Sequence, residues 1–134
     1  MIIDMQVHFW EQDRPDRPQL DLAAPNLPNP FGPEQMLPLM NDAGVDHVVI
    51  VPPGFMGANN AYALECTQEY PQRFSVMGLI DISDVNTPII VRDWLKQPGM
   101  LGIRTHLHSR LRARWGSEEA GERFWSACNE FQIP

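Results

Sequence analysis

Residues 1–8, Met1-Ile2-Ile3-Asp4-Met5-Gln6-Val7-His8, decide how the rest of the chain is interpreted. Apolar and polar residues alternate here, and successive side chains of a strand point to opposite faces. The predicted strand has an apolar face of Ile3, Met5 and Val7 and a polar face of Asp4, Gln6 and His8. In a barrel of parallel strands, the outward face packs on helices and the inward face lines the lumen. We therefore expect the polar set to point into a lumen, where such barrels carry their chemistry, and take it as the candidate catalytic set.

Three further strands and four helices follow in alternation. The strands are predicted at residues 48–51, 74–80 and 101–107 and the helices at 33–43, 60–70, 87–95 and after the cap Ser117. Such alternation implies an α/β fold with a parallel sheet and right-handed crossovers. An open doubly wound sheet and a closed (β/α)8 TIM barrel both fit this order. A complete barrel needs about 250 residues, so we expect the single domain 1–134 to be the N-terminal half of one.

Local signals set the expected helix ends. Gly44 follows the first helix in a position suited to the left-handed conformation. Pro38 lies inside that helix, so either the helix starts later than Pro33 or it is kinked. Thr87 is expected to cap the third helix, with Val91 and Leu95 on its apolar stripe. The last residues, Ile133-Pro134, look like the start of a fifth strand, and we expect the C-terminal half of the barrel to lie outside the chain.

Residues 9–32 form a proline-rich segment that contains Pro15, Pro18, Pro25, Pro28 and Pro30. Proline fixes φ and removes a hydrogen-bond donor, so this segment is neither a helix nor a central strand. Long loops within compact domains tend to be functional. Since its apolar residues give it something to pack against, we interpret it as an ordered active-site loop, with Trp10 as a candidate substrate contact.

Composition narrows the range of partners. The net charge of −7 and a pI near 4.9 disfavour nucleic acid or an anionic membrane as a partner. There is no apolar run long enough to cross a bilayer and no secretory signal pattern. Cys66 and Cys128 lie in predicted helices without metal-type spacing, and we interpret them as buried free thiols in a reducing compartment. We expect a cytoplasmic protein with a small-molecule substrate.

The fourth predicted strand repeats the alternation of the first. Arg104 and His106 share its polar face, and we take them as candidate substrate-binding residues. Arginine suits bidentate capture of a carboxylate or phosphate, and histidine can act as acid, base or ligand. In the alternative interpretation the strand ends early and His108 belongs to a solvated, arginine-rich loop.

Other catalytic motifs have little support. Gly54-Phe55-Met56-Gly57 matches neither the dinucleotide fingerprint nor the P-loop and is better explained as a strand-to-helix loop. A flavodoxin-like sheet that binds a phosphorylated ligand is therefore a weaker hypothesis. There is no Gly-x-Ser-x-Gly elbow, and neither cysteine has a plausible histidine partner.

Three stretches carry a resemblance to a known family. Ile2-Ile3-Asp4-Met5-Gln6-Val7-His8-Phe9-Trp10 resembles the opening strand of the amidohydrolase-related family of metal-dependent hydrolases, which have a TIM-barrel fold. Met100-Leu101-Gly102-Ile103-Arg104 resembles its fourth strand, and Ala43-Gly44-Val45-Asp46-His47-Val48-Val49-Ile50-Val51 also fits. The likeness covers the whole chain, as the N-terminal half of the family's barrel.

The resemblance implies a site for a divalent metal, with zinc as the expected ion. The family's opening strand carries two metal-ligating histidines one residue apart. His8 matches the second, whereas Gln6 replaces the first, and glutamine is a poor zinc ligand. The family's remaining ligands would lie beyond Pro134. By analogy with relatives that act on carboxylated lactones, Arg104 would hold a substrate carboxylate.

Three functions follow as hypotheses. The first is a metal-dependent hydrolase of a small carboxylated lactone, amide or related organic acid, inactive as the 134-residue chain alone. The second is a non-catalytic fragment or degenerate member that is stable only as a homo-oligomer, because a half-barrel exposes sheet edges. The third is a decarboxylase of the same superfamily.

Overall fold

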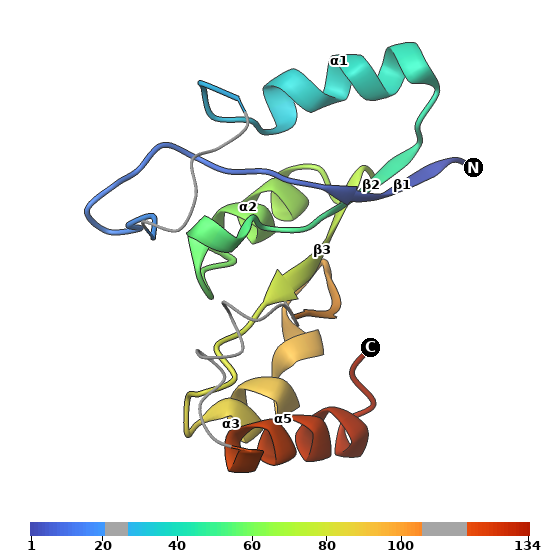
Figure 1. Ribbon diagram of the computed structural model, residues 1–134. Coiled ribbons are helices and arrows are strands. Elements are labelled where there is room, and N and C mark those ends of the chain that lie inside the picture. Colours follow the sequence, from blue (N-terminus) through green and yellow to red (C-terminus); the bar gives the residue numbers. More distant parts are fainter. Residues whose placement is uncertain (21–26, 106–117) are drawn as a thin grey trace.

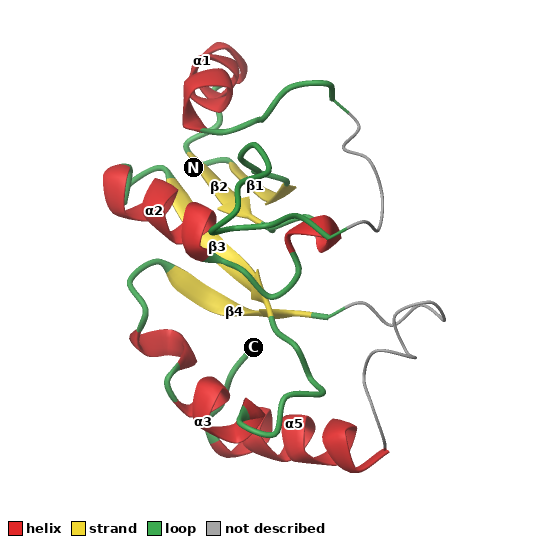
Figure 2. Cartoon of the chain, turned by 90° about the vertical axis from the view of Figure 1, so that its left-hand side faces the viewer, coloured by secondary structure: helices red, strands yellow, loops and turns green. Residues whose placement is uncertain are grey.

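The computed structural model describes residues 1–20, 27–105 and 118–134 (Figure 1). The elements in chain order are β1 (Ile3–Val7), α1 (Pro33–Ala43), β2 (His47–Ile50), the 3-10 turn η1 (Gly54–Met56), α2 (Ala61–Glu69), β3 (Phe74–Leu79), α3 (Thr87–Arg92), the 3-10 turn η2 (Trp94–Lys96), β4 (Met100–Arg104) and α5 (Glu118–Glu130). The strands form one parallel sheet in the order β1-β2-β3-β4 (Figure 2). The predicted α/β fold with a parallel sheet is confirmed.

The main core lies between the sheet and the helices that cover its outer face. Val48, Ile50, Phe74 and Val76 pack there together with Met40 of α1. Residues 48–51 are all buried because both faces of β2 are covered, which explains the continuous apolar run. Burying one such side chain contributes roughly 1.5–3 kcal/mol, so the buried run of β2 anchors this strand in the core.

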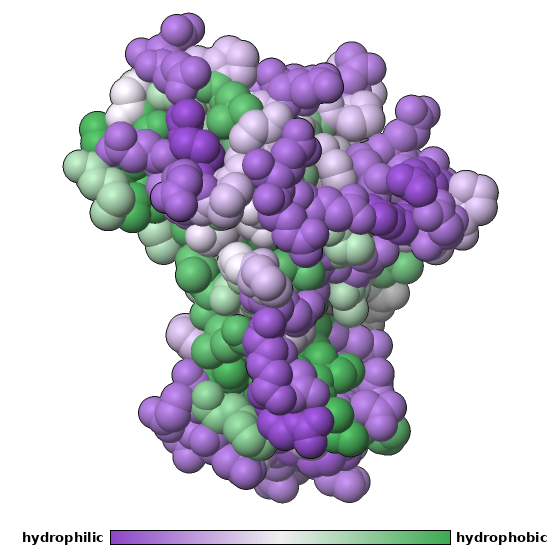
Figure 3. Space-filling model, turned by 180° about the vertical axis from the view of Figure 1, so that it is seen from behind, coloured by the Kyte–Doolittle hydropathy of each residue, from purple (hydrophilic) through white to green (hydrophobic). Residues whose placement is uncertain are grey.

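A second cluster joins α3 to α5, which lie side by side at one end of the molecule (Figures 1 and 2). Val91 of α3 packs there with Phe124 and Cys128 of α5, which confirms Val91 as a stripe residue. Phe131 follows the end of α5 and is partly buried against the same cluster. Seen from behind, apolar surface gathers in the narrow middle of the molecule, between this cluster and the body that holds α1 and α2 (Figure 3).

The ends of α1 agree with the local signals. Gly44 follows the helix with φ 68° and ψ 26°, the left-handed conformation that glycine adopts without strain. The helix begins at Pro33 and runs through Pro38, so the later start considered from the sequence is wrong. Pro38 lacks one helical hydrogen bond, and buried Met36 and Met40 hold the helix against the sheet on either side of it.

The structure corrects the cap residue and the apolar stripe that were expected for α3. Asn86 occupies the cap position rather than Thr87, whose buried hydroxyl lies 2.6 Å from the carbonyl oxygen of Asp84, to which it donates. Leu95 is 46% exposed and does not continue the stripe with Val91. The helix ends at Arg92 and gives way to η2, whose tighter winding changes which side chains face the core.

The apolar face of β1 also departs from the expectation. Met5 is 61% exposed and Ile3 is exposed as well, whereas Val7 packs against the main core. Within the described part of the chain, β1 is an edge strand paired only with β2. Helices therefore cover only its carboxyl end.

At the opposite edge, β4 ends at Arg104, and Leu107 lies outside the described residues. The amide of Ile103 donates to the carbonyl oxygen of Pro134 at 2.9 Å, as it would to a neighbouring strand. Residues 133–134 thus lie along β4 where a fifth strand was expected, although no strand is assigned there.

Candidate active site

A pocket of about 790 Å³ opens beyond the carboxyl ends of β3 and β4. Its lining comes from Arg104 and Thr105 after β4, from residues 79–83 at the end of β3, and from the η1 region before α2. Pro18 and Leu20 of the proline-rich segment complete the lining. A volume of this size is that of a small-molecule site, roughly 300–1,000 Å³. The carboxyl end of a parallel sheet is also where barrels and open sheets of this class bind ligands.

Arg104 is the cation of this pocket. It is the last residue of β4, is paired in register with Leu79, and is only partly exposed. Burial lowers the pKa of its guanidinium, which still remains protonated at neutral pH. Among the described residues, Arg104 forms no salt bridge. A desolvated cation without a carboxylate partner is a suitable site for a bidentate anion.

His8 lies just after β1 and is oriented by the neighbouring strand. Its Nδ1 lies 2.6 Å from the carbonyl oxygen of Val51, which can only accept, so Nδ1 carries the proton. In the neutral ring, the lone pair is then on Nε2. Metal-ligating histidines commonly donate their other ring nitrogen to a backbone carbonyl in this way.

Asp4 and Gln6 share a face of β1, as predicted, and both are exposed. Oδ1 of Asp4 accepts the backbone N–H of Gln6 at 3.1 Å, a contact between residues two apart on one strand. Across residues 1–20, 27–105 and 118–134, no group of three histidine, cysteine, aspartate or glutamate side chains is placed to hold a metal ion. His8 thus fits a metal as one ligand, but the described residues do not complete a coordination shell.

Comparison with known proteins identifies the family. The model of the amidohydrolase family matches residues 3–134. This chain belongs to the amidohydrolase family. An L-fucono-1,5-lactonase of Burkholderia ambifaria is 24% identical over 113 residues, which cover 84% of this chain and 39% of the lactonase.

Two solved structures share the fold of this chain. One is a probable 2-pyrone-4,6-dicarboxylic acid hydrolase of Acinetobacter baumannii with citric acid bound, which has a TM-score of 0.64 at 19% identity. The matched region covers 94% of this chain and 46% of the hydrolase chain. The other is a 5-carboxyvanillate decarboxylase of Novosphingobium aromaticivorans complexed with manganese, which has a TM-score of 0.70 at 16% identity. The matched region covers 100% of this chain and 49% of the decarboxylase chain. The chain therefore spans less than half the length of each of these relatives. These two enzymes have the TIM-barrel fold. The likeness therefore confirms the prediction that this chain has the fold of half a barrel.

Trp10, a predicted substrate contact, does not line the pocket. Trp10 is only 7% exposed and stacks on Phe31 with ring centroids 6.0 Å apart. Its ring also meets Phe55 edge-on at 6.2 Å, so it anchors the proline-rich segment and does not line the pocket. His106 lies outside the described residues.

Asn60 occupies the cap position of α2, but its side chain makes no cap hydrogen bond. The Oδ1 atom of neighbouring Asn59 accepts the N–H of Ala61 at 2.9 Å, so Asn59 supplies the side-chain hydrogen bond that caps the start of α2. Asn60 reaches the carboxyl end of β3, where it accepts from the N–H of Leu79 and donates to its carbonyl oxygen. An asparagine near a helix start gives no local signal for such a contact.

Asp81, which follows β3, is a pocket residue to which the sequence assigned no role. Its Oδ1 accepts from the backbone N–H and from the hydroxyl of Ser83, at 3.0 and 2.6 Å. This turn leaves the second carboxylate oxygen of Asp81 without a partner among the described residues, in the pocket that also contains Arg104. Gly54–Met56, the candidate phosphate turn, forms the short η1 that connects β2 to α2.

Several other expectations can be compared with the structure. Cys66 and Cys128 are buried free thiols, as predicted. No helix in the described ranges is both long and apolar enough to cross a membrane.

Proposed function

We propose that this chain supplies the substrate-carboxylate site of an amidohydrolase that hydrolyses small carboxylated lactones, amides or related organic acids. One observation carries the proposal: Arg104, half-buried and without a salt bridge in the described residues, lines the pocket at the carboxyl end of the sheet. A guanidinium in that position gains most from an anionic ligand, because water solvates it poorly.

The names of the relatives support a carboxylate or lactone substrate. One is a lactonase, and another is a probable dicarboxylic acid hydrolase with citric acid bound. With the carboxylate on Arg104, the ligand's uncharged part would extend along the pocket toward residues 54–59. Asp81, in the same pocket, has one carboxylate oxygen that no described residue occupies, and this oxygen can accept a hydrogen bond from a substrate hydroxyl or water.

A divalent metal is part of the proposal only through His8, whose free Nε2 is suited to serve as one ligand. When bound, such a metal polarises a carbonyl and lowers the pKa of a water. The residues of this chain contribute orientation: Val51 holds the His8 ring, and Asn60 holds the end of β3 beside the pocket.

Decarboxylation is a second candidate, favoured by the likeness to the manganese-containing 5-carboxyvanillate decarboxylase. Arg104 would bind a carboxylate in either reaction. Products distinguish the two: a lactonase releases a proton and an opened acid, whereas a decarboxylase releases carbon dioxide.

The test is titration calorimetry of the purified chain with benzoate and citrate. We expect binding that Arg104→Gln abolishes, while Arg92→Gln, which breaks the exposed Arg92–Asp93 pair, leaves it unchanged. Binding that survives Arg104→Gln would refute the assigned role. Turnover is then measured with a panel of lactones by proton release, and with aromatic acids by carbon dioxide release.

A further inference from the structure

One wall of the pocket comes from the proline-rich segment. Pro18 and Leu20 line the same pocket as Arg104. They lie between Trp10, buried under the segment, and the residues 21–26 that the structure does not describe. Pro18 and Leu20 make this wall apolar. The charged group of the pocket, the guanidinium of Arg104, lies at the end of β4.

Leu20 is held in position by η1 and the residue after it. Its backbone N–H donates to the carbonyl oxygen of Phe55 at 2.7 Å. Its Cδ1 atom lies 3.1 Å from where a Cβ atom on Gly57 would be. Gly57 has φ 62° and ψ −138°, a conformation that only glycine adopts readily. The close approach of Leu20 therefore depends on the absence of a side chain at residue 57.

Arg17 fastens this wall to α2. Its Nη1 donates to Glu65 of α2 at 2.9 Å and to Glu11 at 3.1 Å, and its Nη2 makes a second contact with Glu65. The Arg17 and Glu11 side chains are 20% and 14% exposed, so the pair is better shielded from solvent than an ordinary surface pair. Because Arg17 directly precedes Pro18, the bonds of its side chain set where the wall begins.

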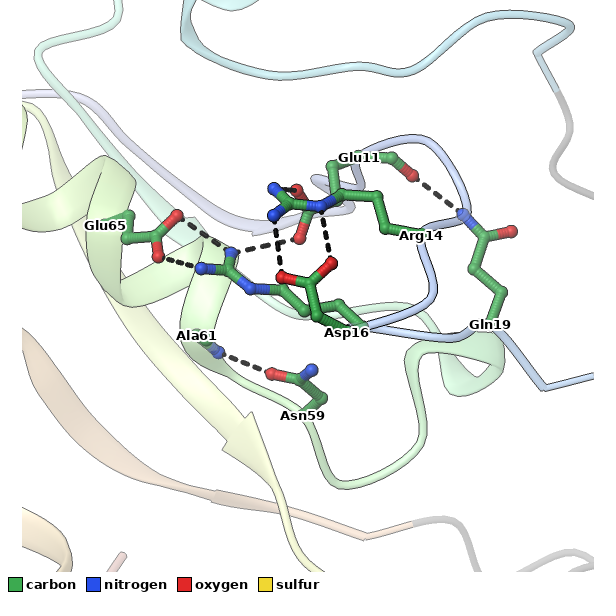
Figure 4. Close-up of polar contacts among 8 residues, drawn as sticks. Glu11, Arg14, Asp16, Gln19, Asn59, Ala61 and Glu65 are labelled. Atoms are coloured by element: carbon green, nitrogen blue, oxygen red, sulfur yellow. Dashed lines mark hydrogen bonds and ion pairs between the residues drawn. The ribbon is translucent and has the colours of Figure 1, made fainter.

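Further bonds stiffen the turn that carries Arg17. The N–H of Arg17 donates to the carbonyl oxygen of Arg14 at 3.0 Å, and Arg14 pairs with Asp16 and Glu11. The side chain of Gln19 donates to the carbonyl oxygen of Glu11 at 2.7 Å (Figure 4). Residues 11–20 thus behave as one cross-linked turn, which keeps Leu20 at a fixed distance from the rest of the pocket.

We propose that Leu20 limits the size of the carboxylate that the pocket accepts, and that Arg17 is the positioning residue that holds Leu20. The chemical class is a compact carboxylate whose uncharged end lies against Leu20. The inference rests on the proposed function, since it takes Arg104 as the carboxylate anchor.

The test compares the binding of benzoate with that of 2-naphthoate by titration calorimetry. Wild type is expected to prefer benzoate. Leu20→Ala should raise the affinity for 2-naphthoate relative to benzoate by about tenfold, the effect of a few methylene groups in an apolar pocket. Leu20→Phe should shift the ratio the opposite way, which a misfolded variant would not do.

Arg17→Gln should shift the ratio in the same direction as Leu20→Ala. It should also speed hydrogen exchange at the Leu20 amide. Without the Arg17 contacts, the hydrogen bond from this amide to Phe55 should open more often. Arg17→Lys keeps the charge but not the forked geometry, and should restore part of the protection. Arg92→Gln is the matched control, with no effect on either measurement.

The outcomes separate this inference from the proposed function. An unchanged ratio in Leu20→Ala, with binding still lost in Arg104→Gln, overturns the inference alone. Unaltered Leu20 exchange in Arg17→Gln overturns the positioning role. Absence of carboxylate binding in wild type, or binding unaffected by Arg104→Gln, overturns the proposed function and the inference with it.

Discussion

The side chain of Asn60 hydrogen bonds to both backbone groups of Leu79: Oδ1 accepts the N–H at 2.9 Å, and Nδ2 donates to the carbonyl oxygen at 2.8 Å. It thereby serves as a strand partner for the last residue of β3. The turn that follows β3 places Asp81 in the pocket. The hydrogen bonds of Asn60 therefore link the start of α2 to one side of the pocket.

Asn60→Ala should lower the free energy of unfolding by about 1–3 kcal/mol, because it leaves two backbone groups of buried Leu79 without partners. Asn60→Asp keeps the acceptor and loses the donor, and should cost less. Urea denaturation measures both. Asn59→Ala is the comparison, since it removes only a helix cap, at about 1 kcal/mol. Equal losses in Asn59→Ala and Asn60→Ala would contradict a special role for Asn60.

His8→Ala should reduce metal binding in the metal-loaded protein by more than about 10–100-fold, the usual cost of losing even an outer-shell partner. The measurement is metal content after dialysis against Mn²⁺ or Zn²⁺. His47→Ala is the control, because both ring nitrogens of His47 contact protein groups, Gln72 and Ser75. Unchanged metal content in His8→Ala would remove His8 from the ligand set.

The Gly44→Ala and Gly57→Ala pair separates backbone strain from the position of Leu20. Both glycines have positive φ, but a Cβ at Gly44 meets open space whereas one at Gly57 meets Leu20. Gly44→Ala should therefore cost about 1–2 kcal/mol of stability without affecting the pocket. Gly57→Ala should destabilise the protein and also change the ratio of 2-naphthoate to benzoate affinity. A ratio that stays constant in Gly57→Ala would mean that Leu20 does not depend on Gly57.

Burial raises the pKa of the Cys66 thiol from its ordinary value of 9.0 to about 12. Between these values the unfolded chain has lost the thiol proton and the folded chain keeps it. Stability contributed by the neutral thiol is therefore fully present below pH 9 and is lost as pH rises toward 12. Urea denaturation between pH 8 and 10.5 should show this decline, and Cys66→Ala should make it smaller. A decline of the same size in Cys66→Ala would assign it to other groups.

Self-association is predicted through the exposed edge of β1. Ile3 and Met5 present apolar surface on a strand that is paired on one side only within the described residues. Such edges invite pairing with another chain, and an added charge discourages it. Met5→Lys should shift the protein toward monomer in sedimentation velocity. Leu39→Lys, which changes an exposed side chain of α1, should not. A wild-type monomer at high concentration would rule out the homo-oligomer.

The sequence alone determined most of the secondary structure, because the signals that start and stop an element are local. The bounds of α1, its glycine stop at Gly44 and the buried run of β2 depend on residues within a few positions of one another. The order of strands and helices then implied a parallel sheet, and the opening strand and β4 carried the family resemblance. The expectation for Arg104 came from the same alternation, which ties a side chain to one face of a strand.

Only the tertiary structure decided which residues share the pocket and what holds them there. Arg17 and Glu65 are 48 positions apart, and His8 and Val51 are 43 apart, so no local pattern joins them. Trp10 was misjudged because an aromatic ring in a loop suits either a ligand or a core, and only its packing on Phe31 distinguishes these. Local backbone preferences act between near neighbours, whereas burial and long-range hydrogen bonds arise only when the sheet brings distant segments together.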